Sequence, residues 1–101
     1  MTRVAAYVPD LMDRSKVAAA APDTAFVATP HALTDIDADV YVLDLNRAGT
    51  LDVLPVLQGR VIGFASHVDR DTLAAANERS GVTAMKRSEF FARLGEIVGS
   101  A

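Results

Sequence analysis

The sequence contains no cysteine and no tryptophan, and aromatic residues make up only 6% of its 101 positions. Without cysteine, neither a disulfide framework nor a thiolate metal site is available. No apolar run approaches the roughly 18 residues of a membrane-spanning helix, and no signal-peptide pattern is present. The net charge of −3 lacks the basic excess that favours nucleic acid or anionic lipid. We therefore expect a cytoplasmic protein that binds neither nucleic acid nor membrane.

Apolar residues, in contrast, make up 50% of the sequence. A chain of this size buries roughly 60–70% of the surface that its unfolded form exposes, which is enough for an independent fold. The sequence has no linker-like or low-complexity segment that would divide it. A single domain spanning residues 1–101 is therefore predicted.

Five short apolar runs are spaced along the chain, and none of them alternates cleanly with polar residues. Continuous runs of this length are typical of parallel strands that are covered on both faces of a sheet. The runs are Val4–Val8, Ala25–Ala28, Val40–Leu43, Val61–Ala65 and Val82–Met85.

Helical patterns of unequal strength separate these runs. The last segment carries an apolar stripe with Ser88 placed to cap it; its members are Phe90, Phe91, Leu94, Ile97 and Val98. Residues 69–79 and 10–21 also have helix start or stop signals. Residues 30–37 allow at most two turns, and in residues 50–58 Pro55 should push Leu54 out of the α region. An α/β fold of the (βα)5 type follows, with a five-stranded parallel sheet and shortened second and third helices.

Polar side chains follow four of the five predicted strands. In an open parallel sheet, the carboxyl ends of the strands are where binding and catalytic residues collect. Any one of these residues has an ordinary alternative role, because polar residues commonly mark the point where a buried strand reaches water. The set comprises Asp10, Asp44 with Asn46, Ser66 with His67, and Lys86.

The two carboxylates, Asp10 and Asp44, suggest a chemistry. Two such charges a few ångströms apart repel by about 4 kcal/mol at an effective dielectric constant near 20, and a divalent cation between them offsets that cost. Mg²⁺ prefers carboxylate, carbonyl and water oxygens. Carboxylates also act as nucleophiles toward phosphate, and Lys86 and Ser66 could hold the oxygens of a phosphoryl group.

In this arrangement the chain resembles the receiver domain of two-component response regulators. The segments "YVPDLMDRS", "VYVLDLNRAG", "VIGFASHVD" and "AMKRSEFFARL" are similar to the four site segments of that family. The resemblance implies a flavodoxin-like three-layer sandwich in which Asp44 is the phosphoacceptor. It also implies Mg²⁺ held by Asp10, Asp44 and the backbone carbonyl of Asn46, with Ser66 and Lys86 on the phosphoryl group.

The sequence departs from the family pattern at several positions. Pro9 replaces the first acid of the acidic pair, Arg87 replaces the proline after the lysine, and Thr83 replaces a switching aromatic residue. These departures support an alternative function, that of a pseudo-receiver that acts without phosphorylation as an interaction module or assembly subunit. An enzyme acting on small phosphoesters is not expected, because neither a glycine-rich phosphate loop nor a catalytic triad is present.

The resemblance also implies a protein partner. It would be a histidine kinase, a phosphotransfer protein or an assembly subunit, bound through the face formed by residues 69–99. A homodimer through the same face is a further expectation. The alanine-rich stretch from Leu73 to Ala76 either packs against the sheet in the ordinary way or forms part of a partner or dimer surface. His67, next to Ser66, is a candidate ligand contact, whereas His31 is expected to have no role in the site.

Overall fold

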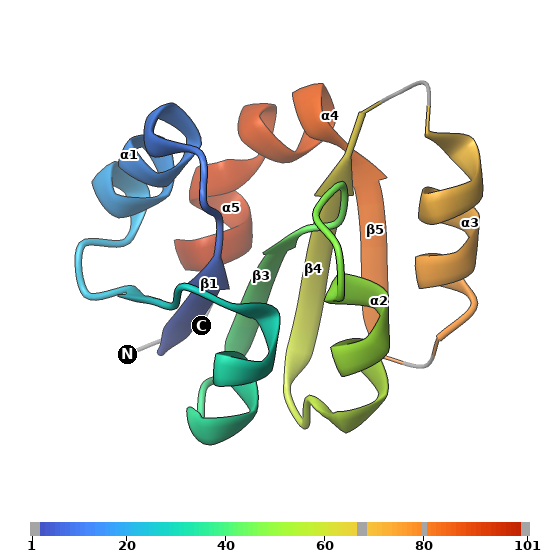
Figure 1. Cartoon of the computed structure of the whole chain (residues 1–101). Helices are drawn as coiled ribbons and strands as arrows, with labels where there is room; N and C mark the ends of the chain where they lie inside the picture. Colours follow the sequence, from blue (N-terminus) through green and yellow to red (C-terminus); the bar gives the residue numbers. More distant parts are fainter. Residues whose placement is uncertain (1–2, 67–68, 80, 100–101) are drawn as a thin grey trace.

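The computed structural model describes residues 3–66, 69–79 and 81–99, and in it strands alternate with helices along the chain (Figure 1). The strands are β1 (Val4–Tyr7), β2 (Ala25–Phe26), β3 (Val40–Asp44), β4 (Arg60–Ala65) and β5 (Val82–Lys86). The α-helices are α1 (Leu11–Ala20), α2 (Thr50–Val53), α3 (Arg70–Asn77), α4 (Arg87–Ala92) and α5 (Leu94–Gly99). Two 3₁₀ helices, η1 (Pro30–Asp35) and η2 (Leu54–Val56), complete the order.

The five strands form one parallel sheet in the order β2-β1-β3-β4-β5. This is the flavodoxin-like topology, and the predicted α/β fold is confirmed. Each predicted apolar run contains one strand, although β2 covers only the first two residues of its run. Because all strands run the same way, their carboxyl ends lie along one edge of the sheet, the upper edge in Figure 1.

Two hydrophobic cores lie on opposite faces of the sheet, because successive strand residues point to opposite sides. On one face Tyr41 and Leu43 of β3 belong to a core closed by η1, α2, η2 and α3. On the other face Val40 and Val42 belong to a core closed by α1, α4 and α5. Burial on both faces explains why the strands read as continuous apolar runs.

The shortened second and third helices are confirmed, but the predicted effect of Pro55 on its neighbour is wrong. Leu54 keeps a right-handed helical backbone, with φ −53° and ψ −44°, and its side chain is buried. Pro55 lies in the first turn of η2, where its missing N–H breaks no helical hydrogen bond. Burial of Leu54 in the core therefore outweighs the local preference of the residue before a proline.

The last helical segment begins and divides differently from the prediction. The N-cap residue is Lys86, in extended conformation, so that Ser88 lies inside α4 and does not cap it. The segment is interrupted at Arg93, whose backbone N–H contacts the carbonyls of both Glu89 and Phe90. The predicted apolar stripe is nevertheless confirmed, since all of its members are buried or partly buried against the sheet.

Gly63 helps to position the chain that leaves β3. A methyl group at Gly63 would lie 2.5 Å from Cδ1 of Leu45, so the absence of a side chain makes room for Leu45. The backbone N–H of Leu45 also donates to the carbonyl of Phe64, at 2.8 Å. The residue directly after Asp44 is therefore fixed against β4 by both packing and hydrogen bonding.

Candidate acidic site at the carboxyl edge of the sheet

The structure places the predicted site residues at the same edge of the sheet. Asp10 precedes α1 directly after β1, Asp44 is the last residue of β3, Ser66 follows β4, and Lys86 ends β5. Of the contacts that hold Asp10 and Asp44 in the described part of the chain, one involves another member of the predicted set, the backbone N–H of Asn46.

Asp44 is largely buried, with its side chain only 8% exposed. Its Oδ1 accepts a hydrogen bond from the backbone N–H of Asn46, at 3.1 Å. Its Oδ2 lies 3.4 Å from Nε of Arg47, which donates to it and forms an ion pair. Both carboxylate oxygens of Asp44 therefore have protein partners.

Asp10 is exposed and caps α1. Its Oδ1 accepts hydrogen bonds from the backbone N–H groups of Met12 and Asp13, each at 3.0 Å. The bond from Asp13 is the main reason why the pKa of Asp10 lies below its ordinary value; the positive charges of Arg87 and Arg47 lower it further. Asp10 is thus an ionised N-cap, a role that stabilises the start of a helix.

The most buried acid of this edge is Asp13, one turn into α1, whose side chain is only 1% exposed. The two terminal nitrogens of Arg87 donate to its two carboxylate oxygens, a bidentate pair between residues 74 positions apart. This bond is the main reason why the pKa of Arg87 is raised, and the charges of Asp13, Asp44 and Asp10 add to it. The guanidinium also lies over the ring of Phe91, with 5.1 Å to the centroid.

Sequence reasoning missed this pair. In the sequence, Arg87 stands out only as a departure from the family pattern, and nothing local links it to Asp13. Their positions in the sequence could have indicated the pair. Asp13 lies one turn after Asp10, and Arg87 follows Lys86 directly. Both residues are therefore expected near the edge where the acids collect.

The carboxamide of Asn46 connects the loops that follow β3 and β4. Its Oδ1 accepts from the backbone N–H of Ser66, at 2.7 Å, and its Nδ2 donates to Oδ2 of Asp69, at 2.8 Å. Asp69 in turn caps α3 by accepting from the N–H of Thr72, at 3.3 Å. The resemblance assigns a role only to the backbone carbonyl of Asn46, so the contacts of its side chain are not predicted from the sequence.

Two of the acids at this edge, Asp13 and Asp44, are paired with arginine side chains. Within the described ranges, no three histidine, aspartate or glutamate side chains are grouped as a metal site would require. Asp13 and Asp44 have both carboxylate oxygens engaged, and the guanidinium groups of Arg87 and Arg47 supply the positive charge that a cation would otherwise bring. The Mg²⁺ site at Asp10, Asp44 and the Asn46 carbonyl stays a prediction.

The remaining predicted residues are placed as follows. Lys86 is exposed and is the N-cap residue of α4. His31 is exposed in η1. His67 lies outside the described residues.

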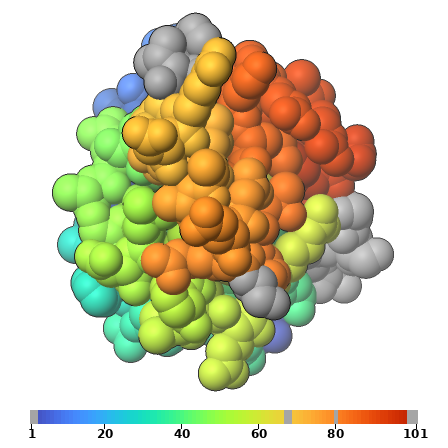
Figure 2. Space-filling model, turned by 90° about the vertical axis from the view of Figure 1, so that its right-hand side faces the viewer, coloured from blue at the N-terminus to red at the C-terminus, as the bar shows by residue number. Residues whose placement is uncertain are grey.

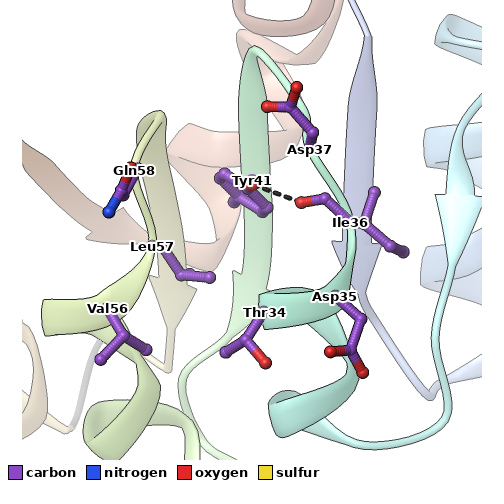
Figure 3. A pocket seen from close by; sticks show the side chains of 8 residues that line it. All are labelled: Thr34, Asp35, Ile36, Asp37, Tyr41, Val56, Leu57 and Gln58. Carbon is purple, nitrogen blue, oxygen red and sulfur yellow. Dashed lines mark hydrogen bonds between the residues drawn. The ribbon is translucent and has the colours of Figure 1, made fainter.

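A hollow of about 360 Å³ lies at the opposite edge of the sheet, and no predicted site residue lines it (Figure 3). It opens between the chain around η1 and the end of η2. The ring of Tyr41 forms part of its wall, and the Tyr41 hydroxyl donates to the carbonyl of Ile36, at 2.5 Å. The side chain of Tyr41 is thus fixed as part of the fold.

In the part of the chain that the structure describes, no helix has the length and apolar character needed to cross a membrane. Comparison with known proteins found neither a family model nor a curated protein that matches the sequence. The flavodoxin-like fold and the acidic edge of its sheet are therefore the grounds on which a function is inferred.

Proposed function

We propose that the chain is a receiver-like interaction domain that binds a partner protein without phosphorylation of Asp44. The observation that carries this proposal is the bidentate pair between Arg87 and the buried Asp13. Arg87 stands where the receiver family has a proline, so the pair belongs to this chain and not to the family pattern.

The pair between Arg87 and Asp13 supplies positive charge to the carboxylates of the acidic edge. Carboxylates close together require a counter-ion, which in the receiver family is a divalent cation. Here the raised pKa of Arg87 reflects interactions with Asp13, Asp44 and Asp10 together, so one guanidinium balances the cluster from within. Arg47 forms an ion pair with Asp44. A phosphoryl group on Asp44 would have to displace contacts that the protein already makes.

The surface next to this edge favours a protein partner. Leu11 and Met12, in the first turn of α1, are 76% and 74% exposed. Two neighbouring apolar side chains in water beside the Asp10 cap are a surface that a partner would cover, since burying apolar area stabilises a complex. The predicted face formed by residues 69–99 offers no such exposed large apolar side chain among its described residues. We therefore place the proposed contact at the start of α1.

A second candidate function is phosphorylation of Asp44 by a histidine kinase or a phosphotransfer protein. The observation that favours it is the common position of Asp10, Asp44, Ser66 and Lys86 at one edge of the sheet. This candidate keeps the predicted roles of Lys86 and Ser66 as contacts of the phosphoryl oxygens.

One experiment separates the two candidates. The protein is titrated with millimolar Mg²⁺ and beryllofluoride, a mimic of an aspartyl phosphate, and its amide NMR spectrum is compared with that of Asp44→Asn. We expect the same spectrum with and without the additives, because the acids already have protein partners. Shifts clustered at Asp10, Asp44 and Lys86 that are absent from Asp44→Asn would instead establish the phosphoacceptor and overturn our proposal.

The partner contact is tested by affinity capture from an extract of the native cells. The Leu11→Ser/Met12→Ser variant should lose the captured partner, because its apolar contact area is removed. Val56→Ser is the matched control, since Val56 is also apolar and 57% exposed but lies in η2. Capture should persist in this control and in Asp44→Asn. Retention by the double variant, or loss in Asp44→Asn, would contradict the proposed contact.

A further inference from the structure

The hollow between η1 and η2 is a cavity that the proposed function does not use (Figure 3). Its volume of about 360 Å³ falls within the range of roughly 300–1,000 Å³ that is typical of small-molecule sites. Seen from the side of α3 and β5, the yellow-green atoms of the chain after η2 lie at the lower end of the molecule (Figure 2). The hollow is therefore at the opposite end of the fold from the acidic edge.

The ring of Tyr41, which forms part of the wall, is held in place by hydrogen bonds and by packing. Its hydroxyl donates to the carbonyl of Ile36, at 2.5 Å, and accepts from the backbone N–H of Ala38, at 3.3 Å. Gly59 makes room for the ring, since a methyl group at Gly59 would lie 2.9 Å from Cε2 of Tyr41. A wall that keeps its shape before binding avoids the cost of ordering side chains when a ligand arrives.

Two hydroxyl groups that line the hollow have their protons engaged within the protein. The Thr34 hydroxyl donates to the carbonyl of His31, at 2.7 Å, just as the Tyr41 hydroxyl donates to that of Ile36. A hydroxyl carries one proton, so toward a ligand each of them can only accept. Gln58, which also lines the hollow, supplies an amide oxygen as well as a donor. These groups favour a ligand that donates hydrogen bonds.

The charged groups that line the hollow are carboxylates. Asp35 and Asp37 belong to the lining, and among the described residues no lysine or arginine does. Asp35 has no ion-pair partner in that part of the chain, whereas Asp37 pairs with Arg3, at 3.6 Å. The Arg3 and Asp37 side chains are 62% and 91% exposed, so this pair is weak and readily exchanged for another. A cationic ligand therefore meets little competition from the protein.

The rest of the lining is apolar. The side chains of Ile36 and Leu57 lie beside the ring of Tyr41 (Figure 3), and Val56, which is 57% exposed, adds apolar surface. Covering such surface with an apolar group stabilises binding. The face of a tyrosine ring also attracts a cation.

We propose that this hollow binds a small organic cation, in which an amidinium, guanidinium or ammonium group is carried on a compact apolar body. The N–H groups of the cation donate to the carboxylates of Asp35 and Asp37, and the apolar body covers Leu57 and the ring of Tyr41. Charge-assisted hydrogen bonds of this kind are roughly twice as strong as those between neutral groups. The site lies at the amino ends of the strands, so it depends neither on Asp44 nor on the contact proposed at the start of α1.

The test uses three probes that share a benzene ring: benzamidine as the cation, benzamide as its neutral analogue and benzoate as the anion. Each is titrated into the protein while amide NMR spectra are recorded. Benzamidine should shift the amides of residues 34–41 and 56–58 and bind about tenfold more tightly than benzamide, because charged hydrogen bonds replace neutral ones. Benzoate should leave these amides unchanged. Equal affinities for benzamidine and benzamide, or no shift with millimolar benzamidine, would overturn the proposal.

Variants at exposed positions show whether the two carboxylates select the cation. Asp35→Asn/Asp37→Asn should lower the affinity for benzamidine to that for benzamide. Asp71→Asn, which removes an exposed acid from the first turn of α3, is the matched control and should bind benzamidine as the parent does. Equal losses in both variants would indicate a general attraction to the negative protein and contradict the site.

A last probe separates a free ligand from a segment of a protein. N-acetylargininamide carries a guanidinium group on a peptide backbone, and it should bind no more tightly than benzamidine. Tighter binding of N-acetylargininamide at the same amides would make the ligand an arginine of a partner protein and overturn the assignment to a small molecule.

Discussion

Replacing Arg87 with methionine should lower the free energy of unfolding by about 2–4 kcal/mol, because the carboxylate of Asp13 is then left buried without its counter-ion. The side chain of Asp13 is 1% exposed, so little water can replace the guanidinium. The expected loss lies below the upper end known for buried pairs, since the Arg87 side chain is itself 45% exposed and the pair is partly screened. Urea denaturation of the variant and the parent measures this difference.

The double variant Asp13→Leu/Arg87→Met is the control for this interpretation. It removes the stranded charge, and replacement of a buried pair by apolar residues is often tolerated. It should therefore recover much of the loss seen in Arg87→Met. Asp13→Leu alone should cost less than Arg87→Met, because Arg87 can turn toward water. Equal stability of Arg87→Met and the parent would mean that the pair does not hold α1 to α4.

The same variant also bears on the proposed function. If the guanidinium of Arg87 stands in for a cation, its removal should raise the affinity of the acidic edge for Mg²⁺ above that of the parent protein. The amide spectrum of Arg87→Met, titrated with Mg²⁺, reports this directly. Absence of any response in a folded variant would show that the acids at this edge do not act as a group.

Replacing Phe90 with alanine should lower the free energy of unfolding by about 3–5 kcal/mol, because a large buried ring is lost and leaves a cavity. Phe90 is fully buried and stacks on Phe64, with 4.6 Å between ring centroids. It also meets the edge of Phe91, at 4.9 Å. The three rings join α4 to β4 beneath the guanidinium of Arg87, which lies over Phe64 and Phe91.

Phe91→Ala is the matched control in the same urea experiment. Phe91 belongs to the same ring cluster but is only partly buried, and the cationic groups of Lys16 and Arg87 both lie close to its ring. Its loss should cost about 1–2 kcal/mol, clearly less than the loss of Phe90, because part of the ring already contacts water. Similar losses for the two variants would mean that the stack of Phe64 and Phe90 does not anchor α4.

The sequence by itself determined the layout of the fold. Residues such as Val40 to Leu43 form strands because a run of apolar residues is stable only where both faces are covered. Right-handed crossovers then bring the ends of parallel strands to one edge. Asp44, Ser66 and Lys86 could therefore be assigned to that edge from their places in the chain. The shortness of the helices around Pro55 was also predictable from the sequence.

Only the tertiary structure decided what the side chains at this edge contact. Arg87 and Asp13 are 74 positions apart, and no local pattern pairs them; their meeting depends on which helices share a face of the sheet. The carboxamides of Asn46 and Asn77 likewise bind groups on neighbouring loops and strands. Hydrogen bonds and ion pairs form over a few ångströms in space, whereas sequence patterns report only neighbours along the chain, so partners brought together by folding are visible only in the folded protein.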